Sequence, residues 1–231
     1  MFLTNSESII SDFHAFVGDE SYPCVAARAA MSRQHIPCLV AGHMGCPADD
    51  GRILDFLRDF VKNFRKADTA LHSAAIIFTG PELQTEESFD RILWNRLQAL
   101  SDLDAQTFRY DQRVSADPTQ PTFSFSLAEE AFFIIGLHPA SSRRARQFKY
   151  PAIVFNPHVQ FQHLRESNRY EKMKNIVRRR DILYSGSINP MLKDFGEASE
   201  AYQYSGRQYD SSWSCPFKVA HEEPQDHSTP E

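Results

Sequence analysis

The stretch that decides the fold is FFIIGLHPASSRRARQFKYPAIVF, residues 132–155. It opens within an apolar run, 131–137, that carries no charged residue and is typical of a central strand covered on both faces. A second apolar run, 152–155, follows a polar segment rich in hydroxyls and arginines. The two runs predict neighbouring strands at the centre of one sheet.

Other strands are expected on both sides of this stretch. Residues 37–42 and 74–78 are short apolar runs that end near glycine, which is typical of buried strands. Phe123, Phe125 and Leu127 alternate with serines, so we expect a half-buried strand there.

Helical periodicity marks the remaining segments. The pattern predicts short helices in 6–16 and 24–31, and a longer helix that begins at an Asp50 N-cap. It also predicts a helix carrying Phe89 to Leu100 on one face, a surface loop over 102–121, and one helix running from Pro157 toward Arg180. Helices and strands alternate without a strict βα repeat, so we expect an α+β single domain with a mixed or antiparallel sheet covered by helices. The domain is expected over 1–221, followed by a disordered tail at 222–231.

Composition narrows the functional classes. The chain has 231 residues and a formal net charge of −5, which gives no general attraction to nucleic acid or to anionic membranes. It has no apolar run of the roughly 20 residues that a membrane span requires, and its first residues lack the order of a secretory signal. The four cysteines lack the spacing of a disulfide framework. We therefore expect a cytoplasmic protein with reduced thiols.

The end of the 131–137 strand is a candidate site. His138 follows the strand directly, and Ser142, Arg143 and Arg146 come within the next eight positions. An imidazole can bind a metal there, and arginines bind carboxylates or phosphates of a cofactor in a bidentate manner. An equally simple interpretation is that His138 ends the strand and the arginines form a solvated face. His158, after the next strand, is more typical of a structural histidine.

Several motifs together resemble one known family. They are YPCVAARAA, GLHPASSRRARQF, PAIVFNPHVQFQHLRESNRYEKM, RRDILYSGSINPMLKDFGEASEAYQYSGR and WSCPF. They resemble the YqcI/YcgG family and, within it, the haem-dependent pre-guanitoxin N-hydroxylases. The resemblance runs from about residue 22 to residue 217.

This resemblance implies a haem b enzyme. Such an enzyme uses dioxygen and an external electron donor to hydroxylate a guanidine nitrogen of arginine or of an arginine-derived amino acid. The sequence has no CxxCH motif, so the haem is expected to be non-covalent. His138 is the first choice of axial ligand and His158 the second, whereas thiolate ligation by Cys24 or Cys215 competes with both.

The resemblance also suggests pocket residues. Glu130 is expected to fix the guanidinium of the substrate, because a carboxylate is the natural partner of that group. Asn189 and Arg207 are expected to complete the pocket by binding a haem propionate or the carboxylate of the amino acid.

Two other classes of function stay open at this point. A haem carrier or gas sensor would bind haem without turning over a guanidine compound. A cofactor-free binding module would be colourless even after haem was supplied. A homodimer also stays open.

Overall fold

The computed structural model describes residues 6–67, 71–191, 193 and 196–221. At its centre is a five-stranded sheet with the order β1-β2-β5-β4-β3. The strands are β1 (Cys38–His43), β2 (Ala74–Gly80), β3 (Phe125–Leu127), β4 (Glu130–Leu137) and β5 (Ala152–Pro157). The β1–β2 pair is parallel and the other pairs are antiparallel. The predicted α+β fold with a mixed sheet is confirmed.

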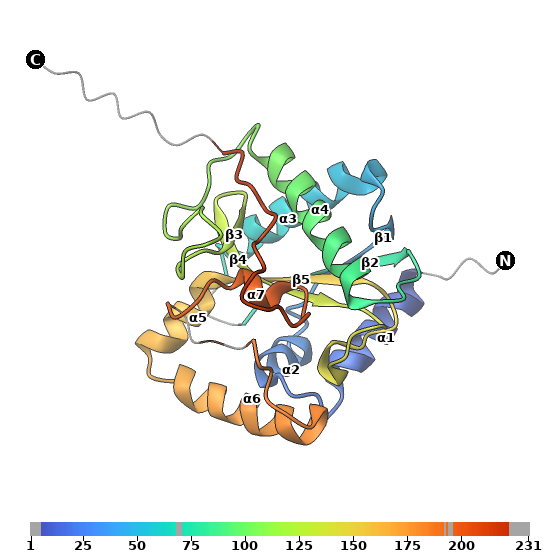
Figure 1. The fold of residues 1–231 in the computed structure, drawn as a ribbon, viewed down its shortest axis with the longest axis vertical. Coiled ribbons are helices and arrows are strands. Elements are labelled where there is room, and N and C mark those ends of the chain that lie inside the picture. The colour runs from blue at the N-terminus through green and yellow to red at the C-terminus, as the bar shows by residue number, and fades with distance from the viewer. Residues whose placement is uncertain (1–5, 68–70, 192, 194–195, 222–231) are drawn as a thin grey trace, which may run out of the picture.

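Helices cover both faces of this sheet (Figure 1). One face carries α3 (Asp50–Phe64) and α4 (Glu86–Asp104). The opposite side carries α1 (Ser6–Gly18), α2 (Val25–Ser32), α5 (His158–Glu166) and α6 (Tyr170–Ser185). The short helices are η1 (Pro47–Asp49), η2 (Arg144–Arg146) and α7 (Ala201–Tyr204), and α7 packs beside β4.

The two apolar cores lie on opposite faces of β4. Phe132 and Ile134 are buried in the core that α3 and α4 cover, whereas Leu137 is buried in the core that α1 and α2 cover, with Ile135 packed against it. Successive side chains of a strand point to opposite faces. The even-numbered residues of β4 therefore face α4, whereas Ile135 and Leu137 face α2. This alternation decides where the side chains after the strand can reach.

Two expectations about helix ends are wrong. The helix predicted from Pro157 toward Arg180 is two helices, because Asn168 adopts a left-handed backbone conformation (φ 56°) that ends α5, and α6 then begins at Tyr170. The N-cap of α3 is Asp49 rather than Asp50, which lies inside the helix, buried and paired with Arg96. The tail expected at 222–231 lies outside the described residues.

None of the described helices has both the length and the apolar character required to cross a membrane.

The contact between β4 and α4 is tight at Gly136. A Cβ atom there would lie 2.6 Å from Cε1 of Phe89 and 3.0 Å from the carbonyl oxygen of Tyr204. We expect Gly136→Ala to lower the free energy of unfolding by about 1–3 kcal/mol, because neither backbone nor a packed ring can give way freely. Urea unfolding measures this change.

Gly51→Ala in α3 is the matched control. A Cβ atom at Gly51 meets no atom within 4 Å, so the same substitution should leave stability unchanged or raise it by about 0.5 kcal/mol. Equal effects at the two positions would show that β4 and α4 are not packed as described.

Candidate functional site

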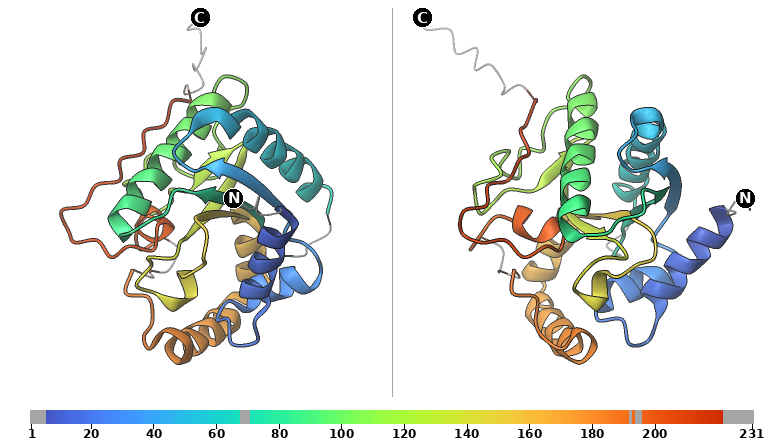
Figure 2. Two further views of the ribbon diagram at one scale, coloured as in Figure 1. Left: turned by 90° about the vertical axis from the view of Figure 1, so that its right-hand side faces the viewer. Right: turned by 45° about the vertical axis from the view of Figure 1, so that its right-hand side comes forward.

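A cavity of about 230 Å³ lies between the sheet and helices α2, α5 and α6. Phe133 and Ile135 of β4 form its floor, and Phe161, Met173 and Val177 come from α5 and α6. Figure 2 shows α6 as the outermost layer on this side of the molecule. The cavity is therefore largely apolar and opens under a peripheral helix.

Cys24 lines this cavity at the N-terminus of α2. Its Sγ accepts a hydrogen bond from the backbone N–H of Ala27 at 3.4 Å, and the residue serves as the N-cap. Burial raises the pKa of the Cys24 thiol, while the N–H groups of Ala27 and Ala26 act in the opposite direction. A metal ion bound there would deprotonate the thiol, and the helix N-terminus would help to hold the resulting thiolate.

A buried polar cluster borders the same cavity. Glu200 lines it and is only 7% exposed. Its Oε2 accepts a hydrogen bond from Oγ of Ser124 at 2.5 Å, and its Oε1 lies 3.5 Å from Nδ1 of His158. Oγ of Ser124 also lies 3.1 Å from Nδ1 of His158. His158, the second choice of axial ligand, is thus engaged in a carboxylate cluster.

Cations are present on the helical wall of the cavity. Arg165 of α5 and Lys174 and Arg178 of α6 line it, as does Lys193. No described side chain of α6 is fully buried. This wall therefore carries positive charge, and Lys174 is paired with Glu171 of the same helix at 2.8 Å.

His138 does not line this cavity. It continues the even-numbered face of β4, is fully buried, and stacks on Phe89 of α4 with the ring centroids 4.1 Å apart. Neither ring nitrogen has a hydrogen-bond partner, and burial, together with the charge of Arg146, lowers the pKa of His138 to about 4. The alternation of the strand directs His138 to the face opposite Cys24, so the two residues do not share this cavity. The choice of His138 as axial ligand stays a prediction.

The arginines after β4 are structural. Arg146 is buried and donates hydrogen bonds to the carbonyl oxygens of Gly136, Gln203 and Tyr204, which ties α7 to the strand. Burial lowers the pKa of Arg146 to about 10. The guanidinium of Arg146 thus binds three backbone carbonyl groups, and its role in binding a cofactor carboxylate stays a prediction.

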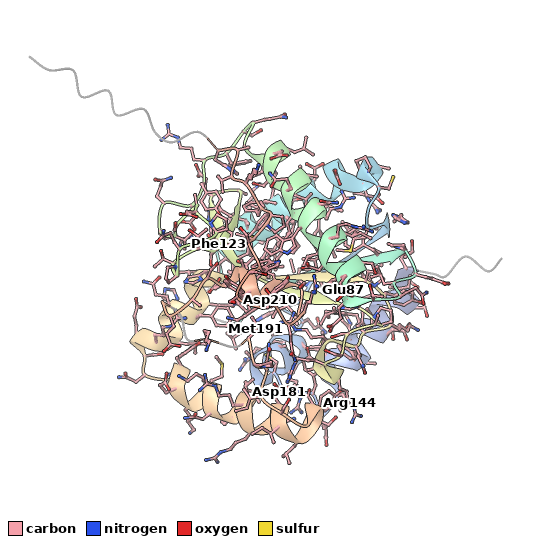
Figure 3. All side chains as sticks on the ribbon, viewed as in Figure 1. Glu87, Phe123, Arg144, Asp181, Met191 and Asp210 are labelled. Carbon is pink, nitrogen blue, oxygen red and sulfur yellow. The ribbon has the colours of Figure 1, made fainter. Side chains whose placement is uncertain are left out.

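Arg143 and Ser142 also have protein partners. Arg143 is buried and bonds to Asp181 of α6 at 2.6 Å, which fastens the C-terminal half of that helix; Figure 3 labels Asp181. Ser142 donates its N–H and its hydroxyl to Oε1 of Glu86, each at 2.8 Å. Neither residue lines the cavity, and both link parts of the chain instead.

Glu130 is already paired with two protein guanidinium groups. Its carboxylate lies 3.3 Å from Nε of Arg65 and 2.9 Å from an Nη of Arg113. It lines a second, wider hollow of about 690 Å³, on the far side of Leu71 and Gln160 from Cys24. Glu130 thus lies outside the cavity beside Cys24 and its charge is already balanced by two guanidinium groups, so its role as the partner of a substrate guanidinium stays a prediction.

The remaining predicted residues lie elsewhere. Asn189 accepts a hydrogen bond from the N–H of Met191. Arg207 pairs with Glu87 and Asp90 beside α4. Cys215 packs against the α3–α4 core, where burial raises the pKa of its thiol to about 12. None of the three lines the cavity, so Cys24 is the predicted cofactor residue that does.

Comparison with known proteins identifies relatives along nearly the whole chain. The family model described as the YqcI/YcgG family matches residues 13–218. The protein named "Uncharacterized protein YqcI" from Bacillus subtilis (strain 168) is 25% identical over 212 residues, which is 87% of this chain and 83% of that protein. No solved structure matches significantly.

The buried neutral His138 predicts a defined pH dependence of stability. Its pKa is about 4 in the folded protein against an ordinary value of 6.5, so the unfolded chain binds the extra proton first as the pH falls. The neutral His138 therefore makes its full contribution to the free energy of unfolding above pH about 6.5, and this contribution is lost as the pH falls toward 4. When the pH is lowered from 7 to 5, the free energy of unfolding of the unmodified protein should fall by about 2 kcal/mol more than that of the His138→Leu variant.

Urea unfolding at the two pH values measures this difference. The same substitution at the exposed His14 serves as the control and should keep the pH dependence of the unmodified protein. If His138→Leu and the unmodified protein lose equal stability, His138 is not buried in its neutral form.

Proposed function

The chain belongs to the YqcI/YcgG family, and from this membership, the motif resemblance and the cavity beside Cys24 we propose that it is a haem-dependent guanidino N-hydroxylase. The proposed substrate is arginine or an arginine-derived amino acid, and dioxygen and an external electron donor are the co-substrates. The position of Cys24 on the cavity wall is the observation that carries the proposal.

The residues around the cavity fit a haem. Cys24 would supply a sulfur ligand, and the aromatic and aliphatic side chains of β4, α5 and α6 would supply an apolar surface. Arg165, Lys174 and Arg178 add positive charge to the wall, where propionates would compete with their present partners, such as Glu171 for Lys174. Haem with a thiolate ligand supplies oxygen activation, because the thiolate favours cleavage of the O–O bond. The other tasks of binding, orienting and excluding water fall to the protein.

The size of the cavity sets a condition on binding. At about 230 Å³ it is smaller than the roughly 300–1,000 Å³ of most small-molecule sites. A macrocycle therefore requires α6 to lie farther from the sheet. No described side chain of this helix is fully buried, and Arg143 holds its C-terminal half through Asp181, so we expect its N-terminal half to be the part that moves.

The protein's own groups define the reaction space. Phe133, Ile135 and Phe161 exclude water from the floor of the cavity, which strengthens electrostatic interactions within it. Gln160 is held in place by two hydrogen bonds to the backbone of His72, so the α5 wall is fixed to the loop before β2. A fixed floor and a displaceable α6 wall suit a site that must admit a large cofactor and then a small substrate.

Cys24→Ser tests the proposal directly. Protein purified from cells supplied with haem should show a Soret band and, when reduced under carbon monoxide, the red-shifted band of a thiolate ligand. Cys24→Ser should lose both, because a serine hydroxyl is a poor ligand for haem iron, and should form no hydroxylated product from arginine by mass spectrometry. Cys215→Ser, in the opposite core, should behave like the unmodified protein.

Two outcomes would contradict this assignment. An unchanged haem spectrum in Cys24→Ser would remove Cys24 as the ligand, and a colourless protein under all loading conditions would end the haem proposal. Haem binding through Cys24 without turnover of any guanidine compound would instead favour the carrier or gas-sensor function.

A further inference from the structure

Glu200 is the acidic side chain among the described residues that line the cavity. We propose that Glu200, held by Ser124 and His158, anchors the guanidinium group of the substrate and sets the preference for a cationic over a neutral side chain. This inference rests on the proposed function and names the residue that selects its substrate.

Ser124 and His158 hold the carboxylate of Glu200 in place. Ser124 has one hydroxyl hydrogen, which it donates in a hydrogen bond to Oε2 of Glu200 at 2.5 Å. The hydroxyl oxygen must then accept from Nδ1 of His158, 3.1 Å away, so Nδ1 carries a hydrogen. The hydrogen bonds from His158 to Ser124 and from Ser124 to Glu200 fix the position of the carboxylate at the cavity wall.

A comparison with Glu130 shows what Glu200 has left to bind. Glu130 receives two arginine side chains, Arg65 and Arg113, which occupy both of its oxygens. Among the ion pairs of the described residues, Glu200 has the imidazole of His158 as its partner and no guanidinium or ammonium group. A carboxylate offers about four acceptor directions, so a ligand guanidinium in the cavity can still bind in a bidentate manner.

The rest of the cavity matches the other end of an amino acid. Arg165, Lys174 and Arg178 line the helical wall, whereas Glu200 belongs to the turn before α7. A ligand with a cationic end and a carboxylate therefore finds opposite charges on two walls. The chemistry predicts tighter binding of a guanidinium-bearing amino acid than of its neutral ureido analogue.

The experiment compares arginine with citrulline, in which a neutral ureido group replaces the guanidinium at nearly the same size. Isothermal titration of the full chain as purified should show tighter binding of arginine. Glu200→Gln removes the charge and keeps the shape, so it should reduce the ratio of the two affinities at least about tenfold. Glu166→Gln, the same change at an exposed position of α5, should keep the ratio.

Two further variants separate anchoring from a purely structural role. Glu200→Asp retains the charge, so it should retain the preference for arginine with a lower affinity for it. Ser124→Ala removes the hydroxyl that positions the carboxylate and should weaken arginine binding several-fold while leaving citrulline binding unchanged. Thermal unfolding shows which of the variants are folded. If Glu200→Gln does not fold, Glu200→Asp provides the test.

The outcomes distinguish this inference from the proposed function. The inference is overturned if folded Glu200→Gln keeps the affinity ratio of the unmodified protein. It is also overturned if Glu200→Asp loses the preference for arginine, or if the unmodified protein binds arginine and citrulline equally well. If the ratio falls as expected in a protein that never binds haem, Glu200 is the anchor and the proposed oxygenase function fails.

Discussion

The alternation of side chains along β4 is the constraint on which the rest of the structure depends. The strand is covered on both faces, so from Ile134 onward successive positions belong to two different environments. Phe132, Ile134 and Gly136 face α4, and His138 continues that side onto Phe89. Phe133 and Ile135 line the cavity beside Cys24. A shift of one residue would exchange the two sets and place an imidazole in the cavity.

The elements of the fold were predictable because their signals are local. The apolar runs of β4 and β5 and the periodicity of α3 and α4 are visible within windows of ten to twenty residues. The break at Asn168 was not predictable, because asparagine is tolerated in helices and its left-handed conformation depends on how α5 and α6 pack. The family was recognisable from motifs spread across the chain, and the family model confirms it.

The site was harder to predict, because its members come from distant parts of the chain. Arg143 and Arg146 follow a buried strand, which is a common place for ligand-binding residues, but their partners are Asp181 and backbone carbonyls contributed by later segments. Ser124 and Glu200 are 76 positions apart. Glu200 stands within a motif that marked the family, yet nothing in its spacing distinguishes it from Glu130, whose carboxylate two arginines already occupy.

The assignments of Cys24 and Glu200 place two tasks on different parts of the chain. Cys24 is the preferred ligand because it lines the cavity, whereas His158 is not among the described residues that line it. His158 contacts Ser124 and Glu200 through Nδ1, so a metal at Nε2 would leave both contacts in place. A sulfur ligand from α2 leaves the cluster intact. The ligand and the anchor then come from separate parts of the chain, so a cofactor and a cationic substrate can occupy the cavity without competing for the same side chain.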